Sequence, residues 1–428
     1  MRMETILRSR IRGCSQRERG SSDLEWCTMA SPSADSARTP RLDSLTSLRW
    51  WAALGVFVFH IRNVVPLPGA VGELARYGNF GVAFFFVLSG FVLTWSWRRE
   101  VGIGTFYWRR FARIYPLHLV TLLLAIPVFY SFAPDPAHTW VKPFDVAVLG
   151  LSFVLLQGWS RDPAILFSGN PASWTLTVEA FFYALHPFIM KAMGRISGRT
   201  AMIAAGGVLL ASVAARFVMV AQPAGMAPDL PWPVLRVNEF IIGMCLAWAI
   251  RSGWRPRIPI WIPFALIAAY VLLPKAIDRM TGSRIDPAIA PFVSEIMVAL
   301  FAILICAYAV ADLEGRTRLS RSAPLVRLGE WSYAFYLIHA TLIYTVLALF
   351  GRQHGLWGIA WIIVLLTASV VCAWALHRLV EHPIERHLRA WQNALVAKRR
   401  ARAASGVSGA TTTRDDRAVV TEPGGEAS

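Results

Sequence analysis

Long apolar runs separated by short polar loops dominate the chain. Each run is about 17 to 23 residues long and holds few charges, which suits a helix that crosses a hydrocarbon core about 30 Å thick. Barrel-type alternation is absent, and lipid leaves helices as the other spanning structure. The pattern therefore predicts an all-α, polytopic membrane bundle. Eleven apolar segments occur, at 47–65, 79–97, 112–131, 144–160, 172–190, 200–220, 233–250, 258–274, 288–310, 331–350 and 357–378.

Basic residues gather in the loops and predict an orientation, because positively charged loops remain cytoplasmic. The basic clusters enclose even numbers of apolar segments, except for three segments between 116 and 191. We therefore expect ten crossings with both termini in the cytoplasm, and 144–160 as a short or re-entrant element. Eleven crossings with one misplaced loop is the alternative.

The two ends of the chain differ from the apolar region in composition. Residues 1–40 are polar and lack the apolar core of a signal peptide. We expect a disordered cytoplasmic extension there, with Met29 as a candidate true start. The membrane domain is expected over 41–389, followed by a disordered cytoplasmic tail over 390–428.

The formal net charge is +17, from 43 Lys and Arg against 26 Asp and Glu. Because these basic residues lie in loops and tails, positive-inside topology and attraction to membrane lipids explain them, and no nucleic-acid partner is expected. The five cysteines have no metal-ligand spacing, so no metal is expected. These features predict a multi-pass protein of the inner or plasma membrane.

The first apolar segment carries two ionisable side chains, Arg49 and His60, whose burial in a membrane costs free energy. Their separation of three helical turns, about 16 Å of rise, puts both on one face. Ionisable residues at membrane depth indicate function, although Arg49 near the interface is also typical of snorkelling. A structural role for His60, bonded to a backbone carbonyl, stays open from spacing alone.

Three other segments hold polar residues on one helical face. Arg110 and Arg113, at the mouth of the third segment, could grip a phosphate, although flanking arginines are also ordinary topology signals. Glu179 lies mid-helix on a face with Tyr183, and pairing with His60 or an arginine would lower its cost. Residues that share one face are Thr175, Glu179, Tyr183 and His186 in one helix, and Ser332, Tyr336 and His339 in another.

Five motifs in order resemble the membrane acyltransferase-3 family of bacterial O-acyltransferases. They are "RLDSLTSLRWWAALGVFVFH", "GNFGVAFFFVLSGFVLTWS", "WRRFARIYPLH", "SWTLTVEAFFYALHP", and "LGEWSYAFYLIH" with "VEHPIER". The resemblance covers about residues 41–388. Ala83 stands where family members often carry an acid, and Ser44 and Ser47 stand where glycines are common. These departures make the substrates of other family members a weaker guide to the substrate of this chain.

The resemblance implies an enzyme that moves a short acyl group, acetyl in the first instance, from cytoplasmic acyl-CoA to a hydroxyl. The acceptor would be a cell-surface carbohydrate, a glycolipid or a secreted small molecule, and no cofactor would be bound permanently. His60 is expected as general base, because an alcohol needs one at neutral pH. A covalent acyl-His60 intermediate is the competing version.

The remaining roles follow the same expectation. Glu179 would orient His60, as a carboxylate does in a catalytic triad. The CoA phosphates would be bound by Arg49, Arg110 and Arg113. Residues expected to bind substrate or support the site are Ser89, Tyr183, Ser332 and His339.

Two non-enzymatic functions remain open at this stage. A proton-coupled transporter or flippase could use the same membrane-depth His and Glu, although no internal repeat is evident. A receptor-like protein that binds a lipid or glycan without chemistry is the other alternative.

Overall fold

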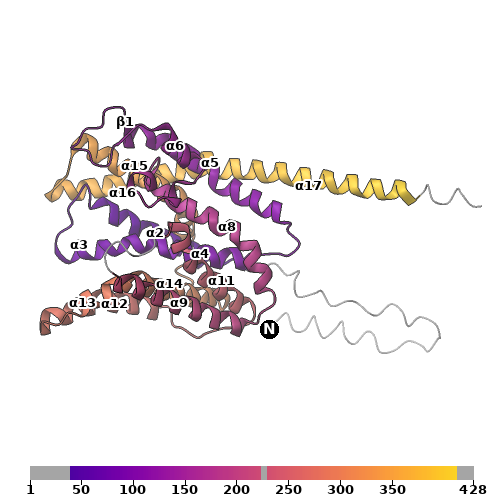
Figure 1. Ribbon diagram of the computed structural model, residues 1–428, viewed down its shortest axis with the longest axis horizontal. Helices are drawn as coiled ribbons and strands as arrows, with labels where there is room; N and C mark the ends of the chain where they lie inside the picture. The colour runs from indigo at the N-terminus through magenta and orange to yellow at the C-terminus, as the bar shows by residue number, and fades with distance from the viewer. Residues whose placement is uncertain (1–38, 223–228, 412–428) are drawn as a thin grey trace, which may run out of the picture. The chain divides into compact units, whose positions relative to one another are not determined.

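The computed structural model describes residues 39–222 and 229–411, of which residue 41 onward belongs to one compact unit. The expected disorder of 1–38 and 412–428 lies outside the described residues. Helices run through almost all of the described chain (Figure 1). The two short strands, β1 (Tyr130–Ser131) and β2 (Lys142–Pro143), pair in parallel.

The predicted helical membrane bundle is confirmed. Among the described residues, seven helices are long and apolar enough to cross a membrane. Three further helices of 19 to 20 residues match predicted segments: α2 (Asp43–Ile61), α8 (Trp174–Met193) and α12 (Ile262–Thr281). The other long helices are α4 (Gly81–Trp95), α5 (Ile103–Phe129), α9 (Gly198–Ala221), α11 (Val237–Arg251), α14 (Val293–Leu313), α15 (Ala323–Phe350), α16 (Gly355–Leu376) and α17 (His382–Thr411).

Short helical elements connect or extend these long helices. The α-helical ones are α3 (Gly69–Arg76), α6 (Val146–Phe153), α7 (Pro163–Leu166), α10 (Trp232–Leu235) and α13 (Ile285–Ile289). The 3-10 turns are η1 (Tyr77–Phe80), η2 (Gln157–Trp159), η3 (Pro171–Ser173) and η4 (Ala290–Phe292), and η5 (His377–Glu381) is a π-helical turn.

The segment expected to be short or re-entrant is short. Helix α6 has 8 residues, about 12 Å of rise, which cannot cross the membrane. Part of the irregular backbone after it, including Gln157, Gly158 and residues 168–170, is buried in the protein, which is where membrane proteins tolerate such backbone. Asn170, for example, donates from Nδ2 to the Leu337 carbonyl of α15 over 2.8 Å.

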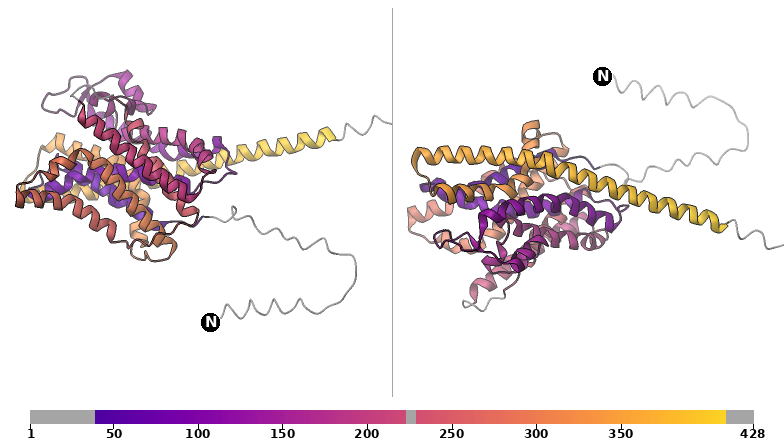
Figure 2. Two further views of the ribbon diagram at one scale, coloured as in Figure 1. Left: turned by 60° about the horizontal axis from the view of Figure 1, so that its bottom comes forward. Right: turned by 90° about the horizontal axis from the view of Figure 1, so that it is seen from above.

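The C-terminal region differs from the expected disordered tail over residues 390–411. Helices α16 and α17 join through η5 without a break, and α17 continues to Thr411 (Figure 2, right view). The segment is rich in Ala and Arg, both strong helix formers. Its low hydropathy argued for disorder, but intrinsic propensity and continuity with α16 extend the helix.

Two close helix contacts, both made possible by glycine, bring the site together. A Cβ added at Gly90 of α4 would collide with the Phe240 carbonyl oxygen of α11. A Cβ at Gly329 of α15 would collide with the Thr46 carbonyl oxygen of α2. Small residues at helix contacts let membrane helices approach closely. Helices α2, α4, α11 and α15 are therefore held at backbone contact around the polar residues described below.

Candidate functional site

Three cavities follow one another through the bundle and contain the residues that the sequence singled out. The arginine cavity, about 200 Å³, is lined by Arg110, Arg113 and Arg49. The glutamate cavity, about 50 Å³, shares Arg49 and Glu179 with it. The histidine cavity, about 270 Å³, contains His60 and His339 and meets the glutamate cavity at Val82 and Tyr336. Because neighbouring cavities share lining residues, the three lie side by side between the arginines and the histidines.

The two arginines of the predicted phosphate grip have different surroundings. Arg110 lies over the Phe106 ring at 5.8 Å, and its buried Nε has no hydrogen-bond partner within the described part of the chain. Arg113 instead forms ion pairs with two carboxylates, Glu381 and Glu385. An anion entering this cavity would therefore find Arg110 available, while Arg113 is already neutralised.

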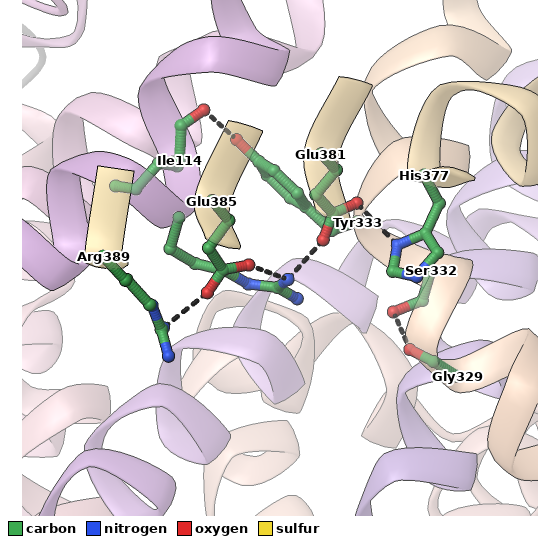
Figure 3. A network of polar contacts seen from close by, with 9 residues as sticks. Ile114, Gly329, Ser332, Tyr333, His377, Glu381, Glu385 and Arg389 are labelled. Atoms are coloured by element: carbon green, nitrogen blue, oxygen red, sulfur yellow. Dashed lines mark hydrogen bonds and ion pairs between the residues drawn. The ribbon is translucent and has the colours of Figure 1, made fainter. Parts of the chain in front are cut away.

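The carboxylates that hold Arg113 come from the C-terminal helices (Figure 3). The π-helical turn η5 places Glu381 in the interior, where it is 2% exposed and also accepts from His377 Nδ1 at 3.1 Å. Glu385 accepts from Arg113 at 3.1 Å and pairs with Arg389. Arg113 thus fastens α5 to α17.

Tyr333 of α15 extends this network (Figure 3). Its ring lies 5.9 Å from the Arg113 guanidinium, and its hydroxyl donates to the Ile114 carbonyl over 2.9 Å. Sequence reasoning used the "VEHPIER" stretch only as part of the family resemblance and missed this role. The signal available was an i, i+4 pair of acids, Glu381 and Glu385, within a basic segment.

Glu179 has a different partner from the expected His60. Its Oε2 accepts a hydrogen bond from the Tyr183 hydroxyl one turn later on α8, at 2.7 Å. Electrostatic attraction from Arg49 and Arg110 also acts on the carboxylate. Glu179 lines both the arginine cavity and the glutamate cavity, and Tyr183 lines the arginine cavity.

In the histidine cavity, the ring of His60 lies beside the ring of His339. The two imidazole centroids are 5.3 Å apart, and the rings are tilted by 52°. Phe59 packs edge-on against His60, at 5.0 Å, and Phe335 stacks on His339, at 6.0 Å. Both rings are thus fixed by aromatic contacts, one from α2 and one from α15.

Hydrogen bonding determines the tautomer of His339. Its Nδ1 lies 2.7 Å from the Tyr336 carbonyl oxygen and 3.2 Å from that of Phe335. Because a carbonyl only accepts, Nδ1 carries the proton, and the neutral ring keeps a lone pair on Nε2. That Nε2 is buried and has no protein partner among the described residues. His339 therefore offers a proton acceptor beside His60.

The two predicted serines lie in the same series of cavities. Ser89 of α4 lines the arginine cavity together with Tyr183. Ser332 of α15 lines the glutamate cavity, and its hydroxyl donates to the Gly329 carbonyl at 2.7 Å (Figure 3). The structure thus places all nine predicted site residues along one path, from Arg110 to His60.

The comparisons with known proteins agree on one family. A family model described as "Acyltransferase domain" (acyltransferase-3) matches residues 42–378. The chain is 35% identical to acyltransferase MdmB of Streptomyces mycarofaciens, over 82% of this chain and 93% of that protein. It is 26% identical to nodulation protein 10 of Rhizobium leguminosarum bv. viciae, over 82% and 94%. No solved structure matches significantly.

A further relative carries an additional region. The chain is 23% identical to O-acetyltransferase OatA of Staphylococcus aureus, over 81% of this chain but only 58% of that protein. The shared part therefore corresponds to the helical membrane domain described above.

Proposed function

This chain belongs to the acyltransferase-3 family, and we propose that it transfers a short acyl group from cytoplasmic acyl-CoA to a hydroxyl. The acceptor hydroxyl would belong to a cell-surface carbohydrate, a glycolipid or a secreted small molecule. The observation that supports this most is the series of three cavities from Arg110 to the His60–His339 pair. Such a path suits a donor with an anionic end and a long thin arm.

The donor would enter with its phosphates at the arginine cavity. Arg110 is available to an anion there, and Arg49 lines the same cavity. Guanidinium groups bind phosphate oxygens through charge-assisted hydrogen bonds. Arg110 belongs to the basic cluster 108–116 in the first half of α5, which favours a cytoplasmic location by the positive-inside rule. We therefore place acyl-CoA entry, and both termini, on the cytoplasmic side of a plasma membrane.

The pantetheine arm would extend through the glutamate cavity. Arg49 and His60 are separated by about 16 Å of helical rise, comparable to the length of that arm. With phosphates near Arg49 and Arg110, the thioester would reach the histidine cavity. Glu179 and Tyr183, which line this route, would position the donor.

The reaction in the histidine cavity needs a base that takes the proton of the acceptor hydroxyl and a route that returns this proton to the leaving thiolate. His60 would take the proton of the acceptor hydroxyl as its oxygen attacks the thioester carbonyl. The new C–O bond forms, the C–S bond breaks, and the proton passes to the CoA thiolate, which leaves as the thiol. His339, with Nδ1 held by Tyr336, would position His60 or share its proton.

The acetyl group is the first choice of acyl chain, because one relative is named an O-acetyltransferase. The experiment is acetyl transfer by the purified protein in vesicles. With acetyl-CoA supplied, release of CoA thiol should depend on an added hydroxyl acceptor. Movement of a glycan or lipid across the vesicle membrane with no acetyl-CoA consumption would instead favour the transporter.

A further inference from the structure

We propose that Glu381 is a positioning residue that limits the affinity of the arginine cavity for CoA, because it keeps Arg113 in an ion pair. The product CoA can then leave after each transfer. This inference rests on the acyl transfer proposed above and concerns the regulation of the same site. Arg113 lines the arginine cavity, and its side chain is 27% exposed, so an anion in the cavity can reach the guanidinium group.

Glu381 is fixed in place by the helix that carries it. It ends the π-helical turn η5 between α16 and α17, and its side chain is only 1% exposed. Its Oε2 accepts a hydrogen bond from His377 Nδ1, one turn earlier, over 3.1 Å (Figure 3). π-Helical turns are rare and frequently occur at functional sites. The carboxylate is therefore held beside Arg113 before any donor arrives.

Glu381 acts on two arginines of the cavity. It forms an ion pair with Arg113, and it also attracts Arg49 electrostatically. Arg49 and Arg113 repel each other, and a buried cation needs a compensating charge. In the protein without a donor, Glu381 supplies that charge from α16–α17.

The charges at this end of the bundle are nearly balanced. Glu385 also pairs with Arg113, at 3.1 Å, and it pairs with Arg389 as well. The arginine cavity and the ion pairs behind Arg113 together hold four arginines and three carboxylates, which leaves one formal positive charge. They are Arg49, Arg110, Arg113, Arg389, Glu179, Glu381 and Glu385.

This balance affects how tightly CoA is held. A phosphate that approaches Arg113 competes with Glu381 for the guanidinium group, so it gains less than it would from an unpaired arginine. Acyl-CoA and the product CoA carry the same phosphates, and binding both equally well does not speed the chemical step. Since product release limits the turnover of many enzymes, weaker phosphate binding favours release of CoA.

The test compares the full-length wild-type protein with Glu381→Gln, which keeps the shape of the side chain and removes its charge. Calorimetry measures CoA binding, and isotope-labelled acetyl-CoA with an extract of the source cells as acceptor measures transfer in vesicles. We expect CoA to bind about tenfold more tightly or better, as for one added charge-assisted hydrogen bond.

The kinetics separate this role from a purely structural one. In Glu381→Gln, the rate of a single turnover should stay unchanged, whereas steady-state turnover should fall and added CoA should inhibit more strongly. CoA should also raise the melting temperature of this variant more than that of the wild type, because tighter binding stabilises more. A purely structural role would weaken CoA binding and slow the single turnover as well.

Two further proteins show whether the effect passes through Arg113. The double variant Arg113→Ala/Glu381→Gln lacks both partners of the ion pair, so its CoA affinity should return to the wild-type value. The charge-matched control is Glu314→Gln, which removes a carboxylate from the exposed ion pair with Arg316 and should leave CoA affinity unchanged.

Glu385→Gln provides the same test if Glu381→Gln does not fold. The Glu385 side chain is less buried, at 14% exposed, and its loss should tighten CoA binding by a smaller factor. In a folded variant, CoA affinity at or below the wild-type value would overturn this inference and leave the acyl transfer intact. A gain that persists in the double variant would do the same. CoA binding without label transfer by the wild-type protein would instead overturn the proposed function.

Discussion

The imidazole rings of His60 and His339 lie 5.3 Å apart, although they belong to helices at opposite ends of the sequence. Gly329 makes this possible, because its missing side chain lets α15 touch the backbone of α2 at Thr46. Both rings line the histidine cavity.

The variant His339→Asn distinguishes the roles of the two ring nitrogens of His339. The amide of Asn can still donate to the Tyr336 carbonyl in place of Nδ1, but it has no equivalent of Nε2. We expect a folded protein whose acyl transfer falls about 10²-fold or more, as for loss of an acid–base group. Transfer kinetics and thermal unfolding in detergent measure both. A normal rate would mean that His339 is only structural.

Arg110→Ala and Arg113→Ala should differ. Arg110→Ala should weaken CoA binding about tenfold at unchanged stability, because a charge-assisted hydrogen bond contributes about 1.5–3 kcal/mol. Arg113→Ala leaves Glu381 and Glu385 without their partner, which should destabilise the protein by about 3–5 kcal/mol. Calorimetry of CoA binding and thermal unfolding separate the effects. Equal effects of both variants on CoA affinity, with equal stability, would contradict this assignment.

Glu179→Gln tests whether Glu179 acts on His60. The hydrogen-bond partner of Glu179 is Tyr183. We therefore expect Glu179→Gln and Tyr183→Phe to show an interaction energy of about 0.5–3 kcal/mol in a double-mutant cycle. The rate should fall less than with His339→Asn. A loss near 10⁴-fold, as for a triad carboxylate, would restore Glu179 as the orienting partner of His60.

Gly329→Val tests the helix contact. The added side chain would collide with the Thr46 carbonyl oxygen, so we expect a loss of about 1–3 kcal/mol in stability, typical of overpacking, together with reduced transfer. Gly207→Ala on α9 is the control, because nothing lies within 4 Å of its added Cβ. Equal thermal stability of the two variants would show that the α2–α15 contact tolerates separation.

Local sequence patterns predicted most of the fold but only part of the candidate site. Hydrophobic runs predicted the helices, and the three-turn spacing predicted that Arg49 and His60 share one helical face; the two residues line adjoining cavities. Which helices meet depends on distant contacts such as Gly329 with Thr46, so the His60–His339 pair could not be derived from periodicity. The expected partner Glu179 sits one cavity away for the same reason.

The neutralisation of Arg113 was equally hidden from the sequence. It depends on the π-helical turn η5, which turns Glu381 inward. One further cavity is lined by Arg216, Glu239 and Glu295, which come from three separate helices. In the sequence, each of these residues only interrupts one apolar run, so periodicity could not predict that they line the same cavity.

The most direct test of the account compares the wild-type protein with His60→Ala in vesicles, with acetyl transfer to hydroxyl and CoA affinity measured on the same samples. The account predicts unchanged CoA affinity, because Arg110 and Arg113 lie two cavities away, and transfer reduced by about 10²- to 10⁴-fold. Full transfer by His60→Ala would contradict it.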